Sequence, residues 1–170
     1  MSLDPAPLIV AASFAPEDHA WLDRLRRAHF PPERNQLSAH LTLFHHLPPS
    51  LEAELKQRLV TATRGVRMPR AEAAGLMSLG GGVAIRIVSP ELEEIRGDLA
   101  DSFRGMLTPQ DAAGWRPHVT IQNKVTADIA RKLQRALEAE FRPVAVRIVG
   151  LGVWRYRGGP WEAVSRHMFG

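Results

Sequence analysis

The sequence predicts an α+β fold of two pseudo-symmetric lobes, each a mainly antiparallel sheet with helices on its outer face and a cleft between the lobes. Three observations support this prediction. Apolar runs of strand length alternate with helices that carry one apolar stripe, glycine-rich turns join neighbouring strands directly, and the same order of elements occurs twice. We therefore expect residues 1–170 to form a single bilobal domain with an internal repeat, about 8–80 and 82–168.

In the first repeat, strands and helices alternate up to a glycine-rich turn. Residues 8–14 are apolar enough to be buried on both faces of a sheet, and leucines at 51, 55 and 59 recur on one face of a helix. The triple glycine at 80–82 lacks the lysine and the following helix of a nucleotide-binding loop, so it predicts a hairpin turn. The expected elements are strands at 8–14, about 40–47, about 71–79 and 83–88, and helices that begin at Pro16 and after Pro49.

The second repeat follows the same order. A helix begins at Pro90, and a loop that contains Pro109 and Gly114 leads to a strand from about residue 116. Thr126 is placed to cap the next helix. That helix has Ile129, Leu133 and Leu137 as its predicted buried stripe, and it is followed by a long strand at about 144–156, a turn at 158–159 and a last strand through 161–167.

The two repeats keep a constant register. The pairs His40 and His118, Leu51 and Ile129, Leu55 and Leu133, and Leu59 and Leu137 are each 78 positions apart. Upstream the offset is 74, as between Pro16 and Pro90 or Leu25 and Leu99. A longer loop before the second motif accounts for the difference of four residues, so the register indicates an internal duplication.

Composition excludes several classes of protein. The chain has no cysteine, which rules out disulfides, thiolate zinc sites and cysteine nucleophiles. Its 22 Lys and Arg against 18 Asp and Glu give a formal charge of +4, which fits an anionic ligand in a cleft or simply a basic surface. No apolar run has the length of a membrane span or the flanks of a signal peptide, so we expect a cytoplasmic protein with no membrane contact and no obligate protein partner.

The chemistry is concentrated in two similar strands, Ser38–Leu43 and Arg116–Ile121. In each strand a histidine is followed two residues later by a threonine, so the imidazole and the hydroxyl lie on the same face. If a pseudo-twofold axis relates the repeats, the two histidines face each other across the cleft. Two such imidazoles can divide proton transfer between them, and the hydroxyls can bind an anion such as a phosphodiester between them.

These motifs, His40-Leu41-Thr42-Leu43 and His118-Val119-Thr120-Ile121, resemble those of the two-histidine phosphoesterases, a superfamily that includes 2′-5′ RNA ligase-like proteins and cyclic nucleotide phosphodiesterases. The resemblance extends from about residue 8 to residue 167. It implies metal-independent hydrolysis of 2′,3′-cyclic phosphodiesters of nucleotides or RNA ends, sometimes with reversible 2′-5′ ligation. It also implies a role in RNA processing, with RNA ends or cyclic nucleotides as substrates and no cofactor.

The resemblance assigns acid–base catalysis to His40 and His118 and phosphate binding to Thr42 and Thr120. We assign His118 as the base that activates water and His40 as the acid that protonates the leaving ribose oxygen. By strand alternation His46 shares a face with His40 and Thr42, while His45 points the other way. The remaining candidate substrate contacts are Phe44, His46, Arg116, Lys124, Tyr156 and Trp161.

Two alternatives remain open at this level. A noncatalytic RNA- or nucleotide-binding protein would use the same fold, although binding alone does not need two opposed imidazoles. A metal-dependent hydrolase would use the histidines at 40, 45 and 46 as ligands, but no nearby carboxylate completes a familiar ligand set, so we expect no metal. The sequence does not distinguish among mononucleotides, RNA ends and other diesters as the substrate.

Overall fold

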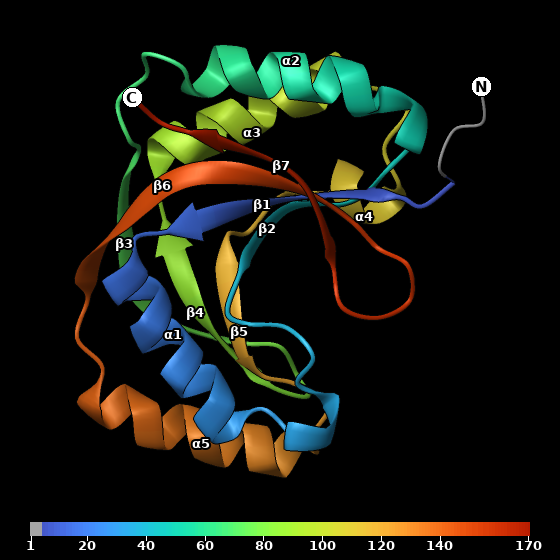
Figure 1. Cartoon of the computed structure of the whole chain (residues 1–170). Helices are drawn as coiled ribbons and strands as arrows, with labels where there is room; N and C mark the ends of the chain where they lie inside the picture. The colour runs from blue at the N-terminus through green and yellow to red at the C-terminus, as the bar shows by residue number, and fades with distance from the viewer. Residues whose placement is uncertain (1–4) are drawn as a thin grey trace.

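A computed structural model describes residues 5–170 (Figure 1). Within this range strands and helices follow the predicted order, with one additional short helix in the stretch predicted as a loop before the second motif. The strands are β1 Leu8–Phe14, β2 Leu41–Leu47, β3 Arg70–Ser78, β4 Val83–Val88, β5 His118–Gln122, β6 Val144–Arg155 and β7 Glu162–Met168. The helices are α1 Pro16–His29, α2 Glu52–Thr63, α3 Pro90–Ser102, α4 Pro109–Ala112 and α5 Ala127–Glu140, with single 3-10 turns at Pro32–Arg34 and Pro49–Leu51.

The strands form one antiparallel sheet, which confirms the predicted α+β class. Its order is β2-β1-β6-β3-β4-β5. Strand β7 lies outside this order and pairs with β6. The long strand β6 joins the two halves: its residues 148–155 pair with β1 and its residues 144–147 pair with β3. The strand order is symmetric about the pair β6 and β3: β1 and then β2 follow on one side, and β4 and then β5 follow on the other.

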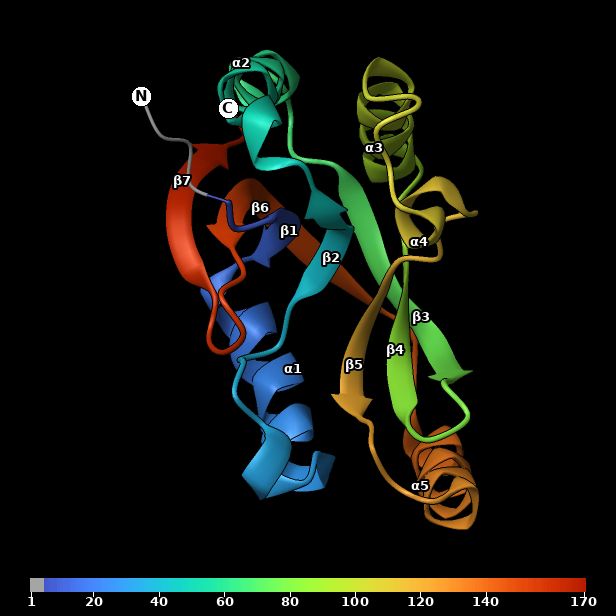
Figure 2. The same ribbon diagram turned by 90° about the vertical axis from the view of Figure 1, so that its right-hand side faces the viewer.

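The helices lie at the two ends of the sheet. In both views α2 and α3 lie at one end of the molecule, and α1 and α5 lie at the other (Figures 1 and 2). Helix α1 packs against β5, a strand of the other half, and α5 packs against β3 and β4. The edge strands β2 and β5 end up close together, facing each other across the middle of the molecule (Figure 2).

Local signals explain most element boundaries. The hydroxyl of Thr126 accepts a hydrogen bond from the backbone N–H of Ile129 at 3.4 Å, as the predicted cap requires. Gly80 adopts a positive φ of 78° in the β3–β4 turn, a conformation that favours glycine. The predicted stripe of α5 is wrong at Ile129, which is 52% exposed, because the helix is rotated to bury Ala130 instead.

No helix between residues 5 and 170 is long and apolar enough to cross a membrane.

Candidate active site

The two motif histidines occupy matching positions and are held in the same way. His40 immediately precedes β2, and His118 is the first residue of β5. The Nδ1 atom of His40 lies 2.8 Å from the carbonyl oxygen of Ser38, and that of His118 lies 2.7 Å from the carbonyl oxygen of Arg116. A carbonyl oxygen only accepts, so each Nδ1 carries the hydrogen and each neutral ring keeps its free lone pair on Nε2. Both motifs therefore fix the same tautomer through the carbonyl two residues earlier.

All four motif residues line one cavity of about 250 Å³. Thr42 lies in β2 and Thr120 lies in β5, and these two edge strands come close together (Figure 2). Besides His40, Thr42, His118 and Thr120, the lining residues are His45, Arg96, Gln110, Asp111, Gly114, Trp115, Arg116 and Trp161. The fold thus brings together imidazoles and hydroxyls that are 78 positions apart in the chain.

Burial makes His40 a weak base for a histidine. It lowers the pKa of His40 from 6.5 to about 4, and the hydrogen bond to Ser38 offsets only part of this effect. The positive charges of Arg26, His45 and His118 lower the pKa further. His40 is therefore neutral at pH 7 when no anion is bound, with Nε2 available to accept a proton.

Two buried arginines hold the motif strands from the opposite halves of the molecule. Arg26 of α1 donates from Nη1 to the carbonyl oxygen of Thr120 in β5 at 3.0 Å. Arg96 of α3 donates from Nε to the carbonyl oxygen of Leu43 in β2 at 3.1 Å. Burial lowers the pKa of both guanidinium groups, yet arginine stays protonated in proteins. Each motif strand is therefore bound by a buried guanidinium group from a helix in the other half of the chain.

Strand β2 is irregular just after its motif. Its residues 42–47 lie opposite residues 8–11 of β1, so β2 carries two extra residues in this stretch. Each extra residue reverses the alternation of side chains. As a result, His45 rather than His46 lines the cavity with Thr42, and the expectation from simple alternation is wrong here.

Asp111 binds the backbone of the irregular stretch. Its carboxylate accepts the backbone N–H of His45 at 2.9 and 3.1 Å, the N–H of His46 at 2.9 Å, and Nδ1–H of the His45 ring at 3.2 Å. Burial alone would raise the pKa of Asp111, but these hydrogen bonds outweigh it and the pKa is lowered. Asp111 thus fixes both the edge of β2 and the orientation of a third imidazole at the cavity.

Two of the predicted substrate contacts lie at the cavity. The Trp161 ring lies 4.7 Å from the His40 ring, centroid to centroid, with the planes inclined at 59°. Arg116 lines the same cavity and is exposed to solvent. Both residues can therefore reach a ligand held between the histidines.

The other four predicted contacts do not line this cavity. Phe44 is fully buried, and the Arg96 guanidinium lies 4.3 Å from the centre of its ring, so the ring belongs to the core. His46 lies within the irregular stretch and is exposed, and Lys124 follows β5 with a positive φ of 66°. Tyr156, at the end of β6, is 44% exposed.

Four further side chains belong to this site without any signal in the sequence pattern: Arg26, Arg96, Asp111 and Trp115. The indole Nε1 of Trp115 donates to the carbonyl oxygen of Thr42 at 3.0 Å. Arg96 and Asp111 bind the backbone of the same strand, β2. All four side chains bind strands that are distant in the sequence. An arginine in the last turn of a helix, such as Arg26, has the sequence pattern of an exposed residue that complements the helix dipole.

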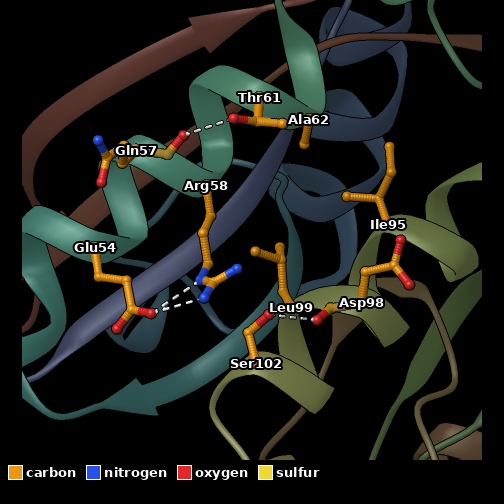
Figure 3. Close-up of a pocket in the computed structure, with 9 residues that line it drawn as sticks. All are labelled: Glu54, Gln57, Arg58, Thr61, Ala62, Ile95, Asp98, Leu99 and Ser102. Carbon is orange, nitrogen blue, oxygen red and sulfur yellow. Dashed lines mark hydrogen bonds and ion pairs between the residues drawn. The ribbon is translucent and has the colours of Figure 1, made fainter.

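A cavity of about 610 Å³ between α2 and α3 has different chemistry (Figure 3). Its lining includes the ion pair of Arg58 with Glu54, together with Asp98 and several neutral side chains. Among its described lining residues there is no imidazole, and the Arg58 guanidinium is already paired with a carboxylate. Its chemistry therefore differs from that of the cavity lined by the two motif histidines.

Among residues 5–170, no group of three His, Asp or Glu side chains is arranged to hold a metal ion. His40 and His45 both line the cavity, but His45 is bound to Asp111 through Nδ1.

The fold and the paired motif strands define a class of α+β proteins already known from crystal structures. The chain is similar to E. coli LigT complexed with 3′-AMP, with 17% identity over 98% of this chain and 99% of that one and a TM-score of 0.60. It is also similar to TT0787 of Thermus thermophilus, with 15% identity over 96% and 97% of the two chains and a TM-score of 0.66. At these identities the likeness concerns the fold alone.

The family assignment comes from the sequence. The model of the 2′-5′ RNA ligase superfamily matches residues 14–160, and the chain belongs to this superfamily. The resemblance inferred from the two motifs is thereby confirmed. No curated protein matches the chain by sequence.

Proposed function

We propose that this protein is a phosphoesterase that hydrolyses 2′,3′-cyclic phosphodiesters of nucleotides or RNA ends, using His40 and His118 as acid–base catalysts and no metal. The observation that carries the proposal is that the two imidazoles, tethered alike at Nδ1, line one cavity. Membership of the superfamily supports it. So do the crystal structures of E. coli LigT with 3′-AMP and with phosphate, because a nucleoside 3′-phosphate is one product of opening a 2′,3′-cyclic phosphate.

The charges around the cavity fit an anionic substrate. Arg96 and Arg116 line it, and the one carboxylate among its described lining residues, Asp111, is occupied by His45 and the β2 backbone. Thr42 and Thr120 supply hydroxyl donors, one from each motif strand. In the proposed mechanism these hydroxyls bind the non-bridging oxygens, whose negative charge grows as water attacks phosphorus.

The proton steps follow from the state of His40. Its pKa of about 4 leaves Nε2 unprotonated at pH 7, which suits a base and favours the reverse of our sequence-based assignment. In the revised scheme His40 takes a proton from the attacking water while the new P–O bond forms. In this scheme His118 enters the reaction protonated on both ring nitrogens, and it gives its Nε2 proton to one ribose oxygen as the bond from phosphorus to that oxygen breaks. The product is a ribose with one free hydroxyl and one phosphate monoester, and solvent exchange restores both histidines.

The proposal is tested by turnover in the absence of metal. Purified protein treated with a chelator is assayed on the four 2′,3′-cyclic nucleotides and on short RNAs with a cyclic phosphate end, and 2′- and 3′-phosphate products are resolved. We expect hydrolysis that survives chelation and yields predominantly one regioisomer, because the site holds the two histidines in fixed positions. Binding of these compounds without turnover would instead identify a noncatalytic binding protein, and activity lost on chelation would identify a metal-dependent enzyme.

The name of the superfamily also points to 2′-5′ ligation, in which the 5′-hydroxyl of a second RNA takes the place of water, the ribose 3′-oxygen leaves phosphorus and the 2′-oxygen stays bound to it. We propose hydrolysis as the main reaction. The balance between the two reactions is measured by incubating a cyclic-phosphate RNA with a second RNA that has a 5′-hydroxyl. A longer product reports ligation, and a phosphate monoester reports hydrolysis.

A further inference from the structure

A second cavity adjoins the candidate active site. It has a volume of about 660 Å³ and shares His40 and Trp161 with the smaller cavity described above. Its other lining residues are Ala11, Ala12, Ser13, Phe14, Pro16, His19, Gln36, Leu37, Ser38, Ala39, Val149, Trp154, Pro160, Arg166 and Met168. We call this cavity the side groove. A ligand in the active site that extends past Trp161 enters it directly.

Small residues of β1 and β6 lie beneath the side groove. Ala11 and Ser13 of β1 pair with Gly152 and Gly150 of β6. A Cβ at Gly152 would lie 3.0 Å from Nε1 of Trp154, and one at Gly150 would lie 2.7 Å from the sulfur of Met168. Glycine within a strand often marks a place where another group approaches the sheet closely. Here it lets the Trp154 indole lie across the strand and leaves space beside it.

Two indoles border this space. The ring centroids of Trp154 and Trp161 are 6.3 Å apart, with the planes inclined at 50°, and Trp161 also contacts His40. Neither indole is fully buried. Aromatic side chains of this kind stack on nucleobases of any sequence.

The charges of the side groove also distinguish it. Its lining residues include Arg166 and His19 but no Asp or Glu, within the part of the chain that the structure describes. In contrast, the α2–α3 cavity and two further cavities each contain at least one carboxylate, among them Asp98 and Glu93. A groove with indoles, a guanidinium and no carboxylate suits single-stranded nucleic acid, which combines stacking faces with a negative backbone.

We propose that the side groove binds the nucleotide immediately 5′ of the terminal cyclic-phosphate nucleotide, so that the substrate is an RNA end of two or more residues rather than a free cyclic mononucleotide. The base of this nucleotide stacks on Trp154, and Arg166 contacts its phosphate. This inference rests on the proposed phosphoesterase function, since it describes how the same substrate continues beyond the catalytic pair.

The test compares two substrates that differ by one nucleotide. We expect kcat/KM for a dinucleotide ending in a 2′,3′-cyclic phosphate to exceed that for the matching cyclic mononucleotide by about 5- to 150-fold, the value of stacking one base on an aromatic side chain. The variant Trp154→Ala should lose most of this advantage and keep its rate on the mononucleotide. The matched control is Tyr156→Ala, which removes an exposed aromatic of the same hairpin that lines neither cavity and should keep the advantage.

A second variant protects the test against misfolding. Arg166 is exposed, so Arg166→Gln should fold normally and lower the dinucleotide advantage, with a weaker salt dependence than the unmodified protein. Equal kcat/KM for the two substrates would overturn the inference and leave the proposed function standing. An advantage that survives both Trp154→Ala and Arg166→Gln would also overturn it. Failure to turn over either substrate would defeat the proposed function itself.

Discussion

At the scale of single residues, the site depends on backbone carbonyls that hold the two imidazoles. Ser38 and Arg116 each present a carbonyl oxygen to the Nδ1 atom of the histidine two residues later. The side chains of Ser38 and Arg116 are not needed for this contact. The same contact forms in both motifs, although His118 is the first residue of β5 and His40 lies just before β2.

The first prediction concerns pH. His40 has to be neutral to act as a base, and its pKa of about 4 lies below the ordinary 6.5, so activity should be retained as pH falls until it reaches about 4. The acidic limb of kcat/KM against pH reports the free enzyme and should have its midpoint near pH 4. The acidic limb of kcat should have its midpoint at a higher pH, because a bound phosphate anion favours the charged imidazole. A midpoint of kcat/KM near the ordinary histidine value of 6.5 would contradict the assignment of His40 as the base.

The second prediction concerns the two hydroxyls. Thr42→Val and Thr120→Val keep the shape of the side chain and remove the donor to the phosphate. A hydrogen bond to a charged group is worth about 1.5–3 kcal/mol, so each variant should lower kcat/KM by about 10- to 150-fold. Thr42→Ser and Thr120→Ser restore the donor and should recover most of the rate. Equal activity of the Val and Ser variants would show that the hydroxyls do not bind the phosphate.

At the scale of elements, β2 is the part of the fold that simple strand rules describe least well. Its first half follows the alternation expected for a strand with one buried face. After Thr42 the two extra residues change the alternation of side chains. As a result, Phe44 is buried in the core and His45 lines the cavity. The positions of these irregularities are set by pairing with β1 and by the α4 carboxylate, and neither is visible in residues 41–47 themselves.

The third prediction concerns this carboxylate. Asp111→Asn replaces acceptor oxygens with an amide that cannot accept all the N–H groups now bound there. We expect the free energy of unfolding to fall by about 1–3 kcal/mol at pH 7, measured by urea denaturation. Because the pKa of Asp111 is lowered in the folded state, its stabilisation is present above the ordinary value of 3.8 and is lost as pH falls through the folded pKa. The difference between the two proteins should therefore shrink in acid, and a difference that does not change with pH would contradict the role of the charge.

At the scale of the whole molecule, each half of the chain holds the motif strand of the other half. Arg26 reaches from α1 to β5, Arg96 reaches from α3 to β2, and β6 pairs with strands of both halves. The relative position of the two imidazoles is therefore determined by long-range contacts. Neither half of the chain contains all the contacts that position its own motif strand.

The fourth prediction tests this bracing. Arg96→Met keeps an apolar stem but leaves the carbonyl oxygens of Leu43 and Asp111 without their buried donor. We expect the free energy of unfolding to fall by about 2–4 kcal/mol, together with a loss of activity, because unsatisfied buried groups are costly. The matched control is Arg104→Met, which removes an 81% exposed arginine paired with Asp101 and should change stability by less than about 0.5 kcal/mol. Similar losses in both variants would contradict the bracing role of Arg96.

Sequence reasoning predicted the part of this structure that local pattern controls. The strand at 8–14, the glycine turn at 80–82 and the two motif strands followed from apolar runs, turn residues and a constant register. The rotation of α5 that buries Ala130 instead of Ile129 did not follow, because tertiary packing decides between adjacent apolar faces. The partners of Arg26, Arg96 and Asp111 did not follow either, since they lie far along the chain and have no local signature.

The central claim is that His40 and His118 act on the same phosphate. It is tested most directly by kcat/KM for a 2′,3′-cyclic nucleotide, in the presence of chelator, for the unmodified protein, His40→Ala, His118→Ala and the double variant, each shown to be folded by circular dichroism. We expect each single change to lower the rate by about 10²–10⁴-fold. The double variant should be about as slow as the slower single variant, because residues that act as a unit lose their effect together. Near-normal hydrolysis by either folded single variant, or losses that multiply in the double variant, would contradict the claim.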